Sequence, residues 1–229
     1  MKKIASKRFK KLLEKSKDKK MEIIDEAIKK VKQNCTAKFD ESIDVSFMLN
    51  LKQKKDEAGL RTVVNLPNGN GKKVKVAVLC EEGKVKEAKE AGAEIAGSEN
   101  LINDITNGKI NFDKLVSTPS MMPKMGKLGK ILGPKGLMPN PKLGTVTNDI
   151  SSSVKLLKAG QIEIKNDPDG NVAASIGKKS FSDIKLKENF DKFKQTILKE
   201  KPNIIKGDYI ISAFLTSTMG ISYKLKIEK

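Results

Sequence analysis

The sequence predicts an α+β protein in which one domain is inserted into another, and three observations lead to this prediction. Apolar and polar residues alternate before residue 67 and after residue 160, as they do in half-buried antiparallel strands. Between these positions, short apolar stretches alternate with helical patterns, as in α/β domains. The Pro, Asn and Gly cluster Pro67–Gly71 marks the first change of pattern as a turn or linker. We therefore expect one domain from residues 1–67 plus 160–229 and a second from residues 68–159.

Two basic helices are expected at the start of the chain. Residues 1–40 hold 14 basic and 6 acidic side chains, in a chain of 229 residues with a formal charge of +18. Both helices have an apolar stripe, made of Ala5, Phe9, Leu12, Leu13 and Ser16 in the first and of Ile24, Ala27, Ile28 and Val31 in the second. A basic amphipathic helix can lie on a membrane. Packing of both stripes on the first domain is the simpler explanation, and it leaves the lysines facing a partner.

The rest of the first domain is predicted to be strands and one long helix. The expected strands are Ile43–Leu51, Arg61–Leu66, residues 160–166, residues 172–176, Tyr209–Ser217 and residues 221–227. The turn Asp167–Gly170 predicts that the third and fourth of these strands form a hairpin, and Thr218–Gly220 joins the last two. The helix covers residues 182–199, with its apolar stripe at Leu186, Phe190, Phe193 and Ile197.

In the second domain the expected strands are short and almost wholly apolar, which is typical of a buried parallel sheet. They are Val74–Cys80, Ala93–Ala96 and Leu115–Thr118. Helices over about residues 84–91 and 99–106 separate them. No GxxxxGK[ST] or GxGxxG motif follows the first strand, so neither a P-loop nor a dinucleotide fingerprint is indicated.

The composition leaves few routes to catalysis. The chain has no His, which excludes a Ser-His-Asp triad, a Cys-His pair and imidazole ligands to a metal. Cys35 and Cys80 have no CxxC spacing, so we expect reduced thiols in a cytoplasmic protein without metal or cofactor. The acidic pairs Asp40–Glu41 and Glu81–Glu82 are expected to be solvated. No apolar stretch approaches the roughly 20 residues that span a bilayer, so no membrane partner is expected.

The positive charge favours a polyanionic partner, because Lys and Arg gain affinity by releasing counterions from phosphates. The alternative is a solvated surface that is merely rich in lysine. Residues 121–144 are the most unusual segment, with five Gly, four Pro, five Lys and no acidic residue. Glycines let a backbone approach closely and lysines contact phosphates, so the segment is either an RNA contact or a structural loop.

Two further segments are candidate RNA contacts. Lys38 and Phe39 precede the strand Ile43–Leu51, and a surface Phe at this point would stack on an unpaired base. The alternative is that Phe39 is a core anchor where helix meets strand. Residues Thr216–Gly220 offer hydroxyls, backbone N–H groups and a flexible Met to an RNA, or they form only a hairpin turn.

Five segments resemble the bacterial ribosomal protein L1 family in their order and spacing, and the resemblance covers essentially the whole chain. They are residues 36–45 (TAKFDESIDV), 66–72 (LPNGNGK), 127–146 (KLGKILGPKGLMPNPKLGTV), 159–167 (AGQIEIKND) and 216–220 (TSTMG). The resemblance implies a discontinuous α+β domain that binds ribosomal RNA and an inserted α/β domain of Rossmann-like, three-layer type. It also implies hinges between the two domains at Pro67, Asn68, Ala159 and Gly160.

The resemblance further implies a non-enzymatic function in the large ribosomal subunit. Its implied partners are the stalk helices of large-subunit rRNA, the deacylated tRNA that it helps to release from the exit site, and its own messenger, which it represses. Off the ribosome the protein is expected to be a monomer. The implied RNA contacts are Lys38, Phe39, Ser212, Thr216, Thr218, Met219 and Gly220, with secondary contacts at Lys127, Lys130 and Lys135. Since the main contacts come from opposite chain ends, they form one surface only if strand 43–51 and the last two strands share a sheet.

The chain departs from the family pattern at three positions. Ile221 stands where Pro is common, which predicts a less rigid turn, and Lys130 and Lys135 stand where Arg is common. Lysine is a point charge and does not make the planar, bidentate contacts of Arg. Two other functions stay open: an enzyme that uses a nucleotide or phosphate on residues 68–159, and a protein that only regulates a messenger.

Overall fold

The computed structural model describes residues 6–15, 21–51, 59–202, 205 and 207–227. The chain divides into two compact units, Met1–Gly71 with Ile162–Lys229 (unit 1) and Lys72–Gln161 (unit 2). These divisions fall a few residues after the limits at 67 and 159 that the sequence suggests. No helix in the described ranges is long and apolar enough to cross a membrane.

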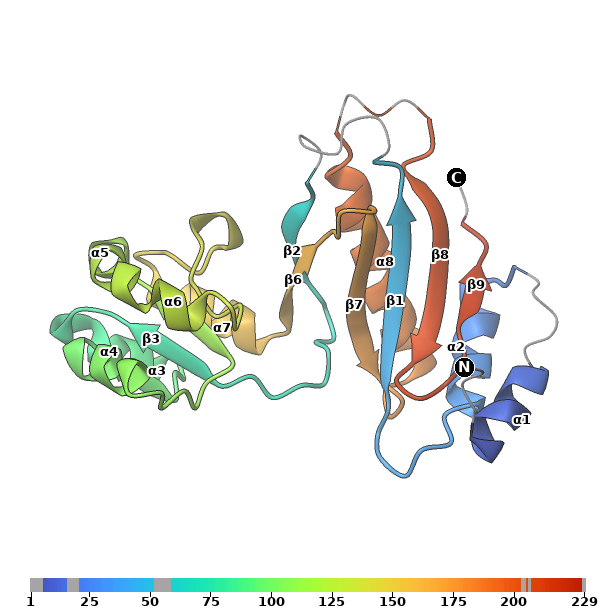
Figure 1. The fold of residues 1–229 in the computed structure, drawn as a ribbon, viewed down its shortest axis with the longest axis horizontal. Coiled ribbons are helices and arrows are strands. Elements are labelled where there is room, and N and C mark those ends of the chain that lie inside the picture. Colours follow the sequence, from blue (N-terminus) through green and yellow to red (C-terminus); the bar gives the residue numbers. More distant parts are fainter. Residues whose placement is uncertain (1–5, 16–20, 52–58, 203–204, 206, 228–229) are drawn as a thin grey trace. The chain divides into compact units, whose positions relative to one another are not determined.

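Unit 1 is built on a four-stranded antiparallel sheet. Its strands are β1 (Ser42–Leu49), β7 (Asn171–Lys178), β8 (Ile210–Ser217) and β9 (Tyr223–Leu225), in the order β7-β1-β8-β9 (Figure 1). The predicted strand 43–51 therefore pairs directly with the first strand of the last pair, which confirms that the two chain ends share a sheet. The β1 residues alternate between partly exposed and buried along their whole length, as the alternating sequence predicts.

Two helices, α2 (Ile24–Gln33) and α8 (Asp183–Lys199), pack on one face of this sheet. The predicted stripe of α8 is buried, and the Phe47 ring of β1 meets Phe190 edge to face at 5.9 Å between ring centroids. The N-terminal helix α1 (Lys7–Lys15) adds Leu12 to the same core, while Leu13 stays largely exposed. The other sheet face carries mainly small and polar side chains, together with Met48 and Phe214.

The predicted hairpin around Asp167–Gly170 is wrong. The strand β6 (Gln161–Lys165) pairs with β2 (Arg61–Asn65) in a separate two-stranded sheet, and β7 pairs with β1. The turn itself is present, since the Gly170 N–H donates to the Asp167 carbonyl at 3.0 Å. The two strands diverge because β7 forms its hydrogen bonds with β1 and not with β6. A local turn signal does not specify the strand with which the next strand pairs.

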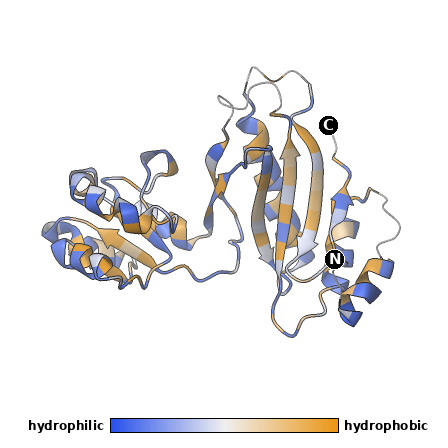
Figure 2. Ribbon diagram, in the orientation of Figure 1, coloured by the Kyte–Doolittle hydropathy of each residue, from blue (hydrophilic) through white to orange (hydrophobic). Residues whose placement is uncertain are grey.

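Unit 2 contains a three-stranded parallel sheet of β3 (Val76–Leu79), β4 (Ile95–Gly97) and β5 (Lys114–Ser117), in the order β4-β3-β5. One face packs against α4 (Glu99–Thr106), α5 (Met122–Met125) and α6 (Gly129–Leu132). The other packs against α3 (Val85–Glu90) and α7 (Ile150–Lys158). Because both faces are covered, β3 is apolar throughout, whereas β1 is banded (Figure 2).

Much of the glycine-rich segment is helical, so the alternative of a loop over residues 121–144 is wrong for residues 121–132. The short 3-10 helices Pro119–Met121 and Gly126–Leu128 alternate with α5 and α6. Met121, Met125, Leu128 and Leu132 are buried at a spacing of four, three and four residues. This helical period of apolar residues outweighs the low helix propensity of the intervening glycines. Two more 3-10 turns of the chain are Glu82–Lys84 and Pro141–Leu143.

Candidate RNA interface

A loop and a turn from opposite chain ends meet at one end of the unit 1 sheet. The loop, residues 36–41, connects α2 to β1, and the turn, residues 216–220, connects β8 to β9. We call them the loop–turn cluster. Since β1 and β8 are neighbours, the Thr218 N–H donates to the Ser42 carbonyl at 3.0 Å and the Ser42 N–H donates to the Thr218 hydroxyl at 3.0 Å. The Thr218 hydroxyl therefore holds the turn onto β1.

A buried carboxylate ties the cluster together. Glu41 is fully buried, so the expectation of a solvated Asp40–Glu41 pair is wrong for this residue. One of its oxygens accepts from the Ala37 N–H at 2.9 Å, and the other accepts from the Met219 N–H at 3.2 Å. The two oxygens thus join the loop to the turn. The sequence pattern carries no signal for this role, because the partners in the second bond are 178 residues apart.

The hydrogen bonds keep Glu41 ionised inside the fold. Burial by itself would raise its pKa, because a low-dielectric surrounding disfavours the charged form. Hydrogen bonds from the Ala37 N–H, the Ser217 hydroxyl and the Met219 N–H outweigh burial and lower the pKa below its usual value. The positive charge of Arg8 acts in the same direction.

A second link comes from helix α1. The Arg8 guanidinium donates to the Thr36 hydroxyl at 2.8 Å and to the Met219 carbonyl at 3.1 Å. The basic N-terminal helix therefore reaches the cluster directly, through one side chain that contacts both the loop and the turn. The charge pattern of the sequence identifies the helix as basic but does not single out this arginine.

The cluster exposes two large apolar side chains. Phe39 is 53% exposed and Met219 is 48% exposed, and Lys38 is also exposed. The alternative that Phe39 is a core anchor is therefore wrong. Exposed apolar groups held on a hydrogen-bonded backbone are suited to contact a partner rather than to stabilise the fold.

Gly220 lies close against the Ser217 side chain in the turn. A Cβ atom at this position would lie 2.2 Å from the Ser217 Oγ, far inside van der Waals contact. The next residue, Ile221, is buried in the core of unit 1, and its side chain anchors the chain where the turn ends. The expectation of a less rigid turn at Ile221 stays a prediction.

Comparison with known proteins identifies the family. A family model described as "Ribosomal protein L1p/L10e family" matches residues 31–221. Large ribosomal subunit protein uL1 of Pelagibacter ubique is 59% identical over 225 residues, which are 98% of each chain. The protein of the same name from Prochlorococcus marinus is 49% identical over 204 residues, 89% of this chain and 87% of its own.

The chain belongs to the ribosomal protein L1 family. This is a family of ribosomal structural proteins and not of enzymes.

In this L1 chain, burial raises the pKa of the thiols of Cys35 and Cys80, which disfavours the reactive thiolate.

The remaining predicted contacts of this L1 protein lie in two places. Ser212 and Thr216 are partly exposed on β8, on the sheet face that α2 and α8 leave open. Lys127, Lys130 and Lys135 belong to unit 2, where all three are exposed. Whether any of them contacts RNA stays a prediction.

The predicted hinge residues of the L1 chain lie on both sides of the division between the units. The Asn68 N–H donates to the side chain of buried Asn189 in α8 at 3.1 Å. Asn189 in turn donates to the Gly69 carbonyl at 2.8 Å, so the segment after Pro67 is fastened within unit 1. Ala159 and Gly160 end α7 in unit 2, and Gly160 has a φ of 106° that favours glycine.

Proposed function

We propose that this L1 family chain is a structural protein of the large ribosomal subunit that binds the stalk region of the rRNA through its loop–turn cluster. The observation that carries the proposal is the double attachment of the cluster, by Glu41 and by Arg8. It holds Phe39 and Met219 exposed on a backbone that is already ordered. A pre-ordered surface loses little conformational entropy on binding, which favours affinity for a folded RNA.

In this proposal, charge supplies affinity and the cluster supplies specificity. The excess of Lys and Arg in a chain of charge +18 attracts any RNA by counterion release. Phe39 and Met219 contact bases, Lys38 contacts phosphate, and Gly220 allows the RNA backbone to approach the turn. The hydroxyls of Ser212, Thr216 and Thr218 are suited to the 2′-OH groups that distinguish RNA from DNA.

The finer parts of the proposal rest on the family resemblance. Unit 2 would move relative to unit 1 on hinges at Pro67, Asn68, Ala159 and Gly160. Secondary RNA contacts would come from Lys127, Lys130 and Lys135. The protein would help to release deacylated tRNA from the exit site and would repress its own messenger. We propose that it works on cytoplasmic ribosomes and is monomeric when free.

A gel-shift titration tests the main proposal. The stalk fragment of large-subunit rRNA is compared with a scrambled hairpin of equal length. We expect the stalk fragment to bind more tightly, and Phe39→Ala and Met219→Ala each to lose about 1–3 kcal/mol of this specific binding. Ile184→Ala serves as the matched control, because Ile184 is 71% exposed on α8 and lies outside the cluster. Equal affinity of the wild-type protein for both RNAs would refute the proposal.

A further inference from the structure

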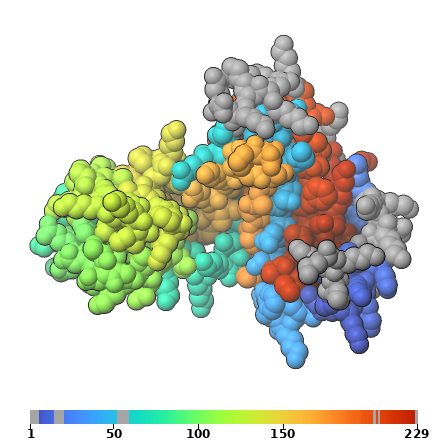
Figure 3. Space-filling model, in the orientation of Figure 1, coloured from blue at the N-terminus to red at the C-terminus, as the bar shows by residue number. Residues whose placement is uncertain are grey.

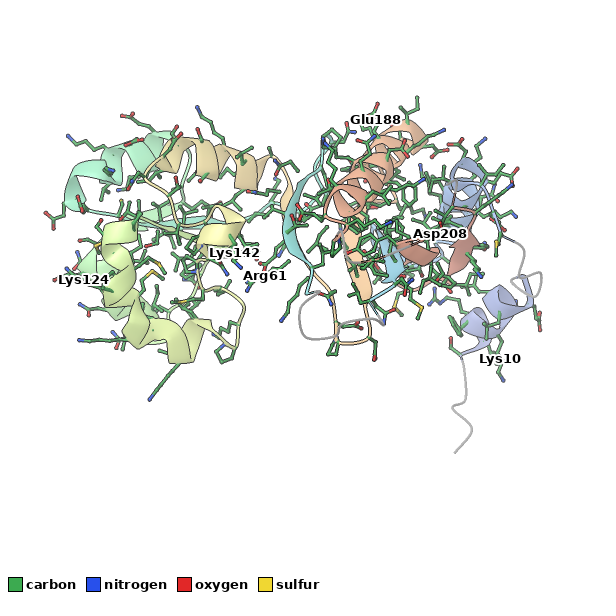
Figure 4. All side chains as sticks on the ribbon, turned by 90° about the horizontal axis from the view of Figure 1, so that it is seen from above. Lys10, Arg61, Lys124, Lys142, Glu188 and Asp208 are labelled. Atoms are coloured by element: carbon green, nitrogen blue, oxygen red, sulfur yellow. The ribbon has the colours of Figure 1, made fainter. Side chains whose placement is uncertain are left out.

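Among the residues of its four strands, the open face of the unit 1 sheet carries one partly exposed aromatic side chain. Phe214 lies in β8 between Ser212 and Thr216, and all three share the partly exposed face. Its ring belongs to none of the hydrophobic clusters formed by the described residues. Since α2 and α8 both cover the opposite face, Phe214 stabilises no core. Figure 3 shows atoms of β1, β7 and β8 at the surface on this side, and Figure 4 shows α8, marked by Glu188, on the other.

The strand register places small or polar residues beside the ring. Phe214 lies directly opposite Ser46 of β1 on one side and opposite Lys224 of β9 on the other. Ser46 is itself opposite Ala173 of β7, so the row of paired residues that crosses the sheet at Phe214 contains no second bulky apolar group. Neighbours along the strand, Ser212 and Thr216, are also short. The bulky neighbour of the ring on this face is Met48 of β1, which lies diagonally from it, one row away and opposite Ser212. The ring itself is partly exposed.

The charges of this face suit a nucleic acid strand. Lys178 lies on the edge strand β7, and Lys224 lies on the edge strand β9. Asp44 lies between them on β1, in the row next to Phe214 and directly opposite Thr216. Phosphates are attracted to the two edges and repelled from the centre. A carboxylate such as that of Asp44 in the centre is suited to accept hydrogen bonds from the amino groups of bases.

We propose that an unpaired nucleotide of the bound RNA stacks on Phe214, which extends the proposed RNA contact from the loop–turn cluster along this sheet face. The inference rests on the proposed rRNA function and adds a contact of a different kind. The loop–turn cluster presents a rigid edge to folded RNA, whereas the sheet presents a flat platform to one unstacked base, flanked by hydroxyls. Ser212 and Thr216 border the ring on both sides, and so connect the platform to the cluster along β8.

The absence of tryptophan from the chain gives a direct test. Phe214→Trp introduces a single fluorophore at the platform, and the stalk fragment of large-subunit rRNA is the probe. We expect Phe214→Trp to keep the wild-type affinity and its emission to be quenched on binding. Quenching should disappear with a stalk fragment whose unpaired nucleotides are paired by compensating substitutions. Phe214→Ala should weaken binding to the unaltered fragment about tenfold.

Further variants separate stacking from a structural role. Phe214→Leu keeps an apolar side chain without a ring and should bind as weakly as Phe214→Ala, whereas Phe214→Tyr should bind like the wild type. Phe181→Leu is the matched control, because Phe181 packs against the unit 1 core. It should leave the affinity of the folded protein unchanged.

Two failures can be told apart. If the wild-type protein prefers the stalk fragment over the scrambled hairpin, but Phe214→Leu binds equally well and Phe214→Trp is not quenched, the platform is refuted and the rRNA function stands. If the wild-type protein shows no such preference, the proposed function fails and the platform that rests on it fails too.

Discussion

The two sheets of the molecule differ in how much of their surface is left for a partner. In unit 2 the parallel sheet β4-β3-β5 is covered by helices on both faces. In unit 1, helices among the described residues cover the antiparallel sheet β7-β1-β8-β9 on one face only. The helices that connect parallel strands cover both faces of their sheet. Antiparallel strands can be joined by short turns, so one face of their sheet can stay exposed to solvent.

The difference explains why the two units present different kinds of surface. Unit 1 displays Phe39 and Met219 on a cluster fixed by long-range hydrogen bonds, and hydroxyls and an aromatic ring on its open face. In unit 2, the lysines Lys127, Lys130 and Lys135 lie on or near short helices that follow β5. Specific recognition is therefore expected from unit 1 and nonspecific electrostatic attraction from unit 2.

The largest effect is expected from Glu41→Gln. The amide keeps the shape of the side chain, but its NH2 group faces a backbone N–H where the carboxylate accepted a hydrogen bond. Losing a hydrogen bond to a buried charged group should lower the free energy of unfolding by about 2 kcal/mol, measured by urea denaturation. Specific affinity for the stalk fragment should fall at least about tenfold, because loop and turn are no longer joined. Wild-type affinity in Glu41→Gln would contradict the bridging role.

The same residue predicts a dependence on pH. The pKa of Glu41 in the fold lies below its usual value of 4.5, so its ionised form stabilises the fold. That contribution is complete above pH 4.5 and is lost as the pH falls through the lower, folded pKa. The difference in unfolding free energy between wild type and Glu41→Gln should thus shrink below pH 4.5. Glu81→Gln removes a charge from an exposed position and is the control for the loss of one negative charge.

A smaller effect is expected from Gly220→Ala. The new Cβ would meet the Ser217 Oγ at 2.2 Å, so the turn or this hydroxyl must shift, at a cost of about 1 kcal/mol for overpacking. Specific RNA affinity should fall with little change in nonspecific binding, as measured by gel shift with both RNAs. Adding Ser217→Ala removes the clashing oxygen and leaves the Ser217 Cβ at 3.5 Å. Because Ser217→Ala also removes a hydrogen bond to Glu41, the double variant is compared with Ser217→Ala alone. The two should bind about equally, and a further loss in the double variant would show that conflict with the hydroxyl is not the cause.

Sequence patterns predict some of these structural features correctly and others wrongly. Alternation along β1 and the stripe of α8 predict their burial correctly, because a period of two or 3.6 residues follows from the geometry of one element. The Asp167–Gly170 turn predicts a hairpin wrongly, since the strand that pairs with β7 is β1, which is distant in the sequence. The helical path of residues 119–132 is obscured by their glycines and prolines, which favour turns, although the buried Met and Leu residues keep a helical spacing.

The site is predictable only where its residues are adjacent in the chain. The segments around Phe39 and Met219 stand out by composition, and their union in one sheet is correctly expected. Glu41 and Arg8 join these segments through hydrogen bonds with residues far away in the sequence, and neither has a local signature. Phe214 also has no local signature in the sequence. A Phe in a strand is ordinarily core, and only the sheet topology shows that this one faces outward.

The smallest effect is expected when Lys127, Lys130 and Lys135 are all changed to Gln. These side chains are exposed in unit 2, and none takes part in an ion pair among the described residues. If they act by charge alone, affinity for the stalk fragment and for the scrambled hairpin should fall by the same few-fold factor. The slope of log affinity against log salt should also become shallower by up to about 0.9 for each phosphate that is no longer neutralised.

A decrease in affinity confined to the stalk fragment would place specific recognition in unit 2. It would contradict the expectation that unit 1 recognises the RNA specifically and unit 2 attracts it by charge alone. Lys86, Lys89 and Lys155, changed together to Gln, remove the same charge from helices α3 and α7 of that unit. This control separates a local contact of the glycine-rich segment from the effect of net charge, because only a local contact makes the first triple variant the weaker binder.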